Sequence, residues 1–236
     1  MALARVQGTA KVIADNAATI AMTLSTLPIV GNGLIVPISA WGGSGFPTGG
    51  CADNRGNTYT RAVVATQANI RAVVYVCAKV ATSAAPFTVT VTPTGNTYMI
   101  GNVIEVSGVG TGLAVDQTSS GINGGAGDTT PTSGATPALT ASEAVLVAAL
   151  GCNTTKGSIT VAVVSPTWTQ EIEELSNAHA VGETDSRIVT SAAGTTPVAQ
   201  WTLNAVDAWA AALAAFKAGV AAGAGESARA FILGPL

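Results

Sequence analysis

The residues of this sequence that could do chemistry are few and scattered. His179 is the single histidine of the chain, so any Ser-His-Asp or Cys-His arrangement would have to use it. It lies in Ser176-Asn-Ala-His-Ala-Val-Gly182, and no G-x-S-x-G segment or similar nucleophile signature stands elsewhere. We therefore expect His179 to be a turn or surface residue, and we expect no catalytic residue in the chain.

Three glutamates near His179 offer the other route to an enzyme. Glu171, Glu173 and Glu174 could act as the paired carboxylates of a glycosidase, in which one acid donates a proton and the other serves as base or nucleophile. Positions i and i+2 of a strand, however, lie on one face, and Glu171 and Glu173 fit the solvent face of a strand. We prefer this interpretation, so a hydrolase is the least favoured function.

Oxygen-rich and sulfur-bearing side chains suggest metal sites only weakly. Asp53, Asn54 and Asn57 could supply oxygen ligands to calcium, but a turn closed by an Asx side chain explains the same residues. The cysteines are far apart and include no C-x2-C pair, which favours small buried apolar residues over zinc ligands or disulfides; they are Cys51, Cys77 and Cys152. We predict no metal and no cofactor.

The four tryptophans could stack on sugars, but in a chain with 5% aromatic residues we expect them to anchor the core. They are Trp41, Trp168, Trp201 and Trp209. The glycine-rich stretches 42–45 and 121–127 lack the lysine of a phosphate-binding loop. They do not indicate nucleotide binding.

Charge and hydropathy exclude several classes of protein. Only 10% of the 236 residues are charged, and the net charge of −3 leaves no basic stripe for nucleic-acid phosphates. The N-terminus has no apolar segment behind Arg5, so no secretory signal is expected. Residues 205–225 are Ala-rich and carry Asp207 and Lys217, which is unlike a membrane-spanning helix. We expect no nucleic-acid or membrane partner.

The elements that must position these residues are strands. Apolar residues alternate with threonine over residues 87–92, and further short Val-, Ile- and Thr-rich segments follow each other at spacings of about ten residues, as in β-sandwiches. The other predicted strands are 19–24, 33–41, 58–66, 70–80, 98–106, 145–150, 158–164, 167–172, 186–191 and 198–203. The nearly continuous apolar run 70–80 predicts a central strand covered on both faces.

The residue pattern alone does not decide the conformation of two segments. Residues 118–137 are rich in glycine, threonine and serine and poor in apolar side chains, which predicts a loop that is mobile or ordered by a neighbour. Residues 207–220 have the propensity of a helix, although their alternation also fits a buried strand. The sequence shows no convincing internal repeat.

The predicted organisation is one antiparallel β-sandwich, jelly-roll-like and all-β, with extended terminal segments. Residues 1–217 form the domain, and residues 218–236 form a flexible Ala/Gly linker and an apolar tail. Large apolar side chains in such a tail need a partner to cover them. The residues that we expect to contact a partner are Phe231, Ile232, Leu233 and Leu236 in the tail, and Ile122 and Asp128 in the loop.

Six stretches, taken in order, cover much of the chain up to residue 217. They are residues 2–7, Gly31-Asn-Gly-Leu-Ile-Val-Pro-Ile-Ser-Ala-Trp41, Asp53-Asn-Arg-Gly-Asn-Thr-Tyr-Thr60, residues 104–109, residues 115–121 and Trp209-Ala-Ala-Ala-Leu-Ala-Ala-Phe-Lys217. As an ordered set they resemble a β-sandwich domain of tailed-phage virion proteins and prophage-encoded hypothetical proteins. In the proteins that it resembles, this last stretch is a strand, so we expect a strand there despite the helix propensity. The resemblance implies a structural or binding role and no catalytic residues.

The resemblance suggests a virion protein, and the lack of a secretory signal suggests that it is made in the host cytoplasm. The lack of any attached module favours a capsid protein over a domain of a long fibre. We expect a capsid decoration or cement protein that binds the major capsid protein on the outer capsid surface as a homo-oligomer, with a trimer favoured. The alternative is a receptor- or carbohydrate-binding module of a head or tail fibre, which would bind a glycan.

Overall fold

The computed structural model describes residues 2–123, 127–153, 161–163, 168–175 and 181–220, with the backbone alone at 161–163. Within these ranges the chain forms strands and turns and no helix, and every strand pairs antiparallel with its neighbours. The prediction of an all-β antiparallel sandwich is confirmed. None of the described segments is a helix long and apolar enough to cross a membrane.

The first large sheet is built from the first half of the chain. Its strands are β1 (Ala4–Gly8), β2 (Val12–Ala17), β4 (Gly33–Trp41), β6 (Thr60–Gln67), β7 (Ile70–Cys77), β9 (Thr97–Gly101) and β10 (Ile104–Ser107). They follow the order β1-β10-β4-β7-β6, with β9 continuing β10 along β4 and β2 pairing with β9. The N-terminal residues thus form the edge of this sheet.

One predicted strand is divided in two. The range 98–106 forms β9 and β10, which pair with β4 in a single register but are interrupted at Asn102 and Val103. Asn102 lies opposite Pro37 of β4 in that register. Because proline has no N–H, the ladder cannot continue there, and the strand breaks.

The second large sheet is built from the second half of the chain. Its strands are β11 (Leu113–Ile122), β12 (Glu143–Cys152), β14 (Thr169–Glu174), β15 (Val181–Thr190) and β17 (Trp209–Ala218), in the order β11-β17-β12-β15-β14. The Ala-rich segment is the strand β17, as expected. Its pairing with β11 and β12 on either side, with every side chain from Trp209 to Phe216 buried, outweighs its helix propensity.

The segment 118–137, expected to be a loop, is partly strand. Residues 118–122 belong to β11 and pair with residues 210–214 of β17. Farther on, the backbone oxygens of Thr129 and Pro131 accept hydrogen bonds from the backbone N–H groups of Leu203 and Trp201, at 2.8 and 2.9 Å. The chain's own backbone therefore orders most of this polar segment, which needs few apolar side chains to hold it.

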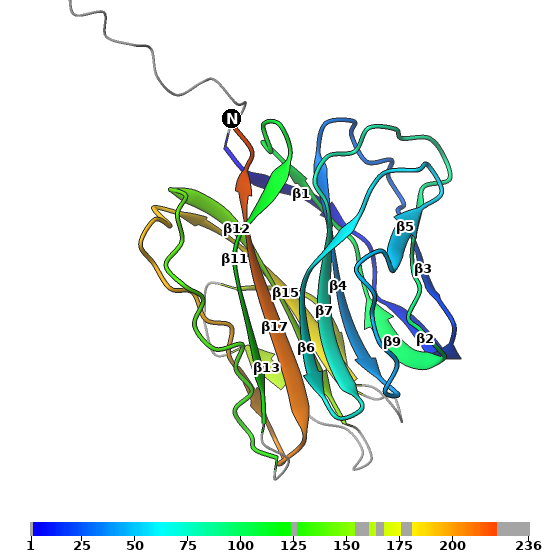
Figure 1. Cartoon of the computed structure of the whole chain (residues 1–236), viewed down its shortest axis with the longest axis vertical. Coiled ribbons are helices and arrows are strands. Elements are labelled where there is room, and N and C mark those ends of the chain that lie inside the picture. Colours follow the sequence, from blue (N-terminus) through cyan, green and yellow to red (C-terminus); the bar gives the residue numbers. More distant parts are fainter. Residues whose placement is uncertain (1, 124–126, 154–160, 164–167, 176–180, 221–236) are drawn as a thin grey trace, which may run out of the picture.

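A small sheet covers the outer face of each large sheet. One consists of β3 (Ile20–Thr23), β8 (Thr88–Val91) and β5 (Cys51–Asp53), and the other pairs β13 (Val161–Val163) with β16 (Trp201–Leu203). Figure 1 shows the resulting layers side by side, with the two large sheets in the middle. Both faces of β4 and β12 are covered, which explains their nearly continuous apolar sequences.

The two halves repeat one strand order. In each half, eight successive strands enter the large and the small sheet in the same order: large, small, large, small, large, large, small, large. In the first half, β1 and β2 count as one strand, and so do β9 and β10. In the second half, residues 129–133, which pair with β16, take the place of the first strand of the small sheet. Within the large sheet of either half, neighbouring strands are the first, last, third, sixth and fifth of these eight, in that order. Such alternation between two sheets is jelly-roll-like. This structural repeat is not visible as a repeat of the amino-acid sequence.

The main core lies between the large sheets. Apolar side chains of β4, β7 and β10 meet those of β12 and β17, among them Ile35, Val74 and Ile104 on one side and Val147 and Phe216 on the other. Toward one end most of the side chains that meet are small, such as Ala72, Ala149 and Ala212, and they pack with Ile70. The sheets approach closely at Gly182, where an added Cβ would lie 2.6 Å from the Ser39 Cβ.

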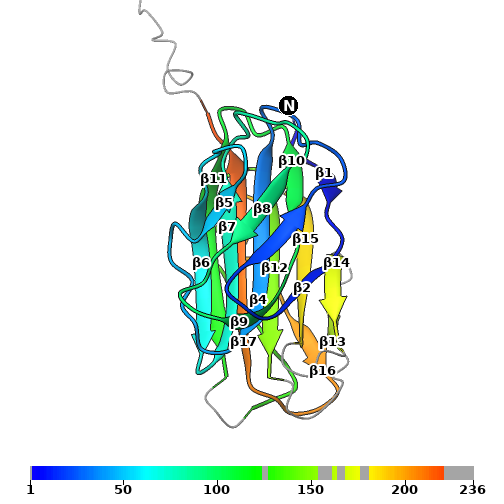
Figure 2. The ribbon, with the colours of Figure 1, turned by 90° about the vertical axis from the view of Figure 1, so that its right-hand side faces the viewer.

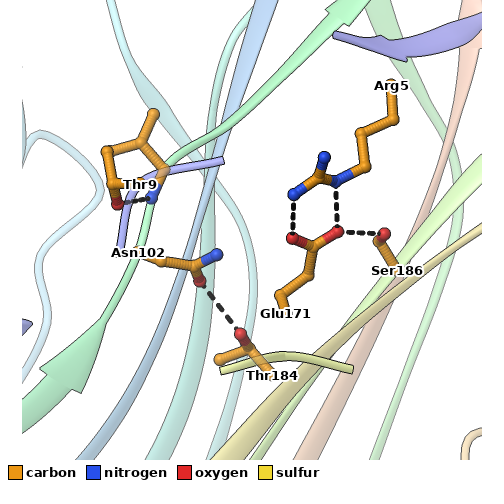
Figure 3. A network of polar contacts seen from close by, with 7 residues as sticks. Arg5, Thr9, Asn102, Glu171, Thr184 and Ser186 are labelled. Atoms are coloured by element: carbon orange, nitrogen blue, oxygen red, sulfur yellow. Dashed lines mark hydrogen bonds and ion pairs between the residues drawn. The ribbon is translucent and has the colours of Figure 1, made fainter. Parts of the chain in front are cut away.

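Polar bonds also join the two halves. The Ser39 hydroxyl donates to the Leu150 carbonyl oxygen at 2.6 Å, and the Thr184 hydroxyl donates to the Asn102 side-chain oxygen at 2.9 Å. At the edge, the Arg5 guanidinium binds both carboxylate oxygens of Glu171, at 2.6 and 2.7 Å (Figure 3). Such partners lower the cost of burying polar groups between the two halves.

Candidate functional site

Three large apolar side chains are exposed within four residues of one loop. Leu27, Ile29 and Val30 have 42%, 59% and 58% of their surface exposed. They lie in the connection from β3 to β4, just before the central strand of the first sheet begins. The other exposed large apolar residues among those described are dispersed along the chain, so this loop is the densest such group.

Backbone hydrogen bonds fix the conformation of this loop. The Asn32 N–H donates to the Ile29 carbonyl oxygen at 3.0 Å and closes a turn, in which Gly31 has a φ of +101°. Glycine adopts this conformation without the strain that a side chain causes. Gly31 and Asn32 also exchange backbone hydrogen bonds with Val80, at 2.9 and 2.7 Å. The tip of the loop is thereby attached to the segment that follows β7.

The buried carboxylate of Glu105 accepts hydrogen bonds from the loop. Glu105 of β10 is fully buried, and its carboxylate accepts hydrogen bonds from the Ile29 N–H at 2.8 Å and from the Asn32 and Gln7 side-chain amides, each at 2.6 Å. The Gln7 amide also donates to the Thr26 carbonyl oxygen at 3.1 Å. A buried charge is costly unless it is hydrogen-bonded, so these neutral donors stabilise the Glu105 carboxylate in its buried position.

A groove opens at the same end of the molecule. It has a volume of about 740 Å³ and is bordered by Ala78, Leu113, Ala141, Glu143, Lys217 and Val220, among others. Residues 78–80 connect it with the loop, because Ala78 lines the groove while Val80 binds the loop tip. Figure 2 shows that the first strand, β10 and the end of β17 lie together at this end.

The loop and the groove offer surfaces on which a partner could bind. The side chains described there are aliphatic or already paired. Ile29 and Val30 present aliphatic surface in a fixed conformation, so little conformational entropy is lost when a partner covers them. The charged groups of the groove are already engaged: the Lys217 ammonium binds the Asp116 carboxylate at 2.9 Å, and the Glu143 carboxylate accepts the Leu3 N–H at 3.0 Å. This end of the molecule is suited to docking a partner.

A second cluster of titratable groups lies on β15, away from the loop. Glu183 and Asp185 point to the same face and are 0% and 1% exposed, and Asp185 accepts the Trp201 indole N–H at 2.9 Å. Within the described part of the chain, neither Glu183 oxygen accepts a hydrogen bond of ordinary geometry. Burial, and then the neighbouring Asp185 carboxylate, raises the pKa of Glu183 well above its ordinary 4.5; burial also raises the pKa of Asp185.

The Glu171 side chain does not lie on the solvent face of its strand, so the interpretation was wrong for this residue, while Glu173 is half-buried. The Glu171 and Glu174 side chains are 1% and 5% exposed and form ion pairs with Arg5 and Lys11, each at 2.6 Å. A bulge between Gln170 and Ile172 disturbs the alternation of β14 and turns Glu171 inward. These carboxylates are bound to cations from the N-terminal strands.

The other candidate residues have structural roles where they are described. The Asp53 carboxylate accepts the backbone N–H groups of Arg55 and Asn57, at 2.8 and 3.1 Å, and so closes the expected Asx turn. The three cysteines are buried and free, as predicted. Among the described residues, no three His, Cys, Asp or Glu side chains gather in a way that could hold a metal ion.

The tryptophans confirm the core interpretation in two positions. Trp201 and Trp209 are 1% and 3% exposed. Trp41 is half-buried and lies against Tyr98 with ring centroids 5.6 Å apart. Trp168 is partly buried against the core on the outer face of the second sheet.

The residues expected to contact a partner have different positions. Ile122 is 50% exposed at the end of the edge strand β11. Asp128 is half-buried and accepts the Trp209 indole N–H at 2.9 Å, so it already has an internal partner. Phe231, Ile232, Leu233 and Leu236, like His179, lie outside the described residues. The contacts expected of these residues stay predictions.

Sequence reasoning missed the loop and Glu105. The signals present were a lone glutamate in the apolar segment Ile104-Glu-Val106 and aliphatic residues between Pro28 and Gly31. Neither signal identifies Gln7 or Asn32 as partners. Comparison with protein-family models, with curated proteins and with solved structures finds no match for the chain.

Proposed function

We propose that this chain is a structural protein of a tailed-phage virion, a decoration or cement protein that binds the outer surface of the capsid. It acts as a homo-oligomer, a trimer being favoured, and holds neighbouring copies of the major capsid protein together. It is made in the host cytoplasm and acts without a cofactor or catalytic residue. The sequence resemblance to phage virion domains supports this class of function.

The fixed apolar loop is the observation that carries the proposal. Ile29 and Val30 are more than half exposed, and the buried Glu105 maintains the loop that presents them. Apolar side chains in a rigid, exposed turn are typical of a docking surface. Of the described residues, these two are therefore our choice for the contact with the capsid.

The mechanism is stabilisation by mass action. A protein that binds the assembled lattice, and not the dissociated subunits, stabilises that lattice by about 4 kcal/mol when its concentration is about a thousand times its Kd. An oligomer that binds through several subunits at once gains further affinity from the high local concentration of the remaining sites.

Co-sedimentation with assembled capsids from the same genome tests the proposal. We expect the oligomer to pellet with capsids, and the double variant Ile29→Asp/Val30→Asp to remain in the supernatant. Ala21→Arg is the matched control, because Ala21 is exposed on the outer face of β3, away from the loop. Wild-type protein that stays in the supernatant would contradict the proposal, and equal pelleting of the loop variant would exclude the loop.

A glycan-binding module of a head or tail fibre is the second candidate. The half-buried Trp41–Tyr98 pair favours it, because it lies at the end of β4 opposite to the loop and offers aromatic surface on which a sugar could stack. Binding to a glycan array that is lost in Trp41→Ala would support this candidate. A monomer that binds no capsid but binds glycans would replace the first proposal by the second.

A further inference from the structure

The groove at the end of the sandwich lacks large side chains on most of its border. Apart from Leu3 and Leu113, which are 4% and 5% exposed, its apolar border consists mainly of Ala78, Ala114, Ala141 and Ala218. Walls of small side chains leave space that a bulky apolar side chain from elsewhere can occupy. The volume of about 740 Å³ lies in the range of about 300–1,000 Å³ that is usual for sites of ligands.

The described chain ends on the border of this groove. Gly219 is tied to it by hydrogen bonds from its N–H to the oxygens of Gly112 and Val109, at 2.6 and 3.1 Å. Val220, the next residue, is 84% exposed and lines the opening. Sixteen further residues, 221–236, follow from this point. This C-terminal segment is therefore attached to the chain at the border of the groove.

The composition of these residues matches the groove. Residues 221–225 are Ala-Ala-Gly-Ala-Gly, a composition that lets the chain reverse direction. Phe231, Ile232, Leu233 and Leu236 are the bulky apolar side chains that the groove lacks. The ten residues from 221 to 230 span at most about 33–36 Å, ample for a return to the groove.

We propose that residues 226–236 dock into the groove of their own chain. Attachment at Val220 gives the segment an effective concentration in the millimolar range, which favours its own groove over that of another copy. Docking removes four large apolar side chains from water and fills the space above Leu3 and Leu113. It requires no capsid, so it is independent of the function proposed above.

Hydrogen exchange of the full chain tests this inference. We expect the amides of residues 229–234 to be protected at least about tenfold relative to the free peptide 226–236. Ala141→Arg, which places a long charged side chain in the half-buried border of the groove, should abolish this protection. Ala21→Arg, the same change on the exposed face of β3, should retain it.

A second variant avoids any change in the folded domain. Phe231→Asp/Leu233→Asp in the full chain should speed exchange at Leu113 and Ala141, the amides of the groove itself, by a similar factor. Unprotected tail amides in the wild type, or protection that survives Ala141→Arg, would overturn the inference. Protection that disappears on hundredfold dilution would show instead that the segment of another copy is the occupant.

Discussion

At the scale of single residues, the carboxyl groups of this protein divide into those with donors and those without. Glu105 has three neutral donors and no ion-pair partner among its hydrogen bonds, and it holds an exposed loop. Glu171 and Glu174 bind cations of the N-terminal strands. Glu183 lies beside Asp185, and among the described residues it has no hydrogen-bond donor on either oxygen. These differences lead to different responses to substitution and to pH.

Replacing the Glu105 carboxylate should loosen the loop and weaken the fold. Glu105→Gln removes the charge that strengthens three hydrogen bonds. It also replaces one acceptor oxygen by an amide donor, which then faces either the Gln7 amide or the donors of Ile29 and Asn32. We expect the free energy of unfolding in urea to fall by about 1–3 kcal/mol. Gln200→Glu, the reverse exchange of an amide and a carboxylate at an exposed position, should alter it by less than about 0.5 kcal/mol. Equal stability of Glu105→Gln and wild type would show that the carboxylate is dispensable.

The Glu183 carboxyl should make the protein less stable as pH rises. Its pKa is raised in the folded protein, so the folded state holds the proton more tightly than the unfolded state. The contribution to stability is therefore complete below the ordinary pKa of 4.5 and is lost progressively as pH rises above it. Each unit of raised pKa corresponds to about 1.4 kcal/mol.

Glu183→Gln tests this dependence, since glutamine cannot lose a proton. Urea unfolding between pH 5 and pH 9 should show a decline in wild-type stability that is clearly smaller in the variant. The variant should be the more stable protein at the alkaline end. An identical pH profile for both proteins would mean that folding leaves the pKa of Glu183 unchanged.

At the scale of strands, the close approach of the two large sheets depends on small residues. An added Cβ at Gly182 of β15 would lie 2.5 Å from the Leu150 carbonyl oxygen and 2.6 Å from the Ser39 Cβ. Gly182→Ala must therefore separate β15 from its neighbours, and we expect a loss of about 2 kcal/mol or more in thermal or urea unfolding. Gly49→Ala is the control, because nothing lies within 4 Å of its added Cβ. Equal stability of the two variants would contradict this packing argument.

The strands that the sequence predicts well are those whose own residues determine them. The bounds of β4 were predicted correctly because a continuous apolar run between Asn32 and Gly42 can be buried on both faces. The edge strand β11 was missed because its residues are mostly small and polar and its partner β17 lies about ninety residues farther on. The break between β9 and β10 depends on Pro37 of another strand, so no local pattern could indicate it.

The same limit applies to the candidate site. A carboxylate such as Glu105 is recognisable only together with Gln7 and Asn32, whose side chains reach it from 98 and 73 residues away. The burial of Glu171 depends on a bulge and on Arg5, which lies in another half of the chain. Polar positions inside the fold are fixed by tertiary partners, and these are not evident from spacing.

At the scale of the whole molecule, the two halves need each other. Each large sheet exposes an apolar face until the other covers it, with Ile35 and Val74 on one side and Val147 and Phe216 on the other. We expect residues 1–110 and 111–220, produced separately, to aggregate, and the two fragments produced together to form a soluble complex. Cosolubility and the circular dichroism of the purified pair are the measurements. A first half that folds alone as a monomer would show that the small sheet on its outer face is sufficient.

Three segments of the chain meet at the groove, so the chain could be connected in a different order there. Leu3 beside β1, Gly219 after β17 and residues 108–112, which connect the halves, all lie at one end, and Gly110 and Gly219 form a β-bridge there. A short peptide could therefore join residue 220 to residue 2, and the chain could be opened near Gly110 instead. Such a circular permutant would exchange the order of the halves in the gene while leaving every strand pair in place.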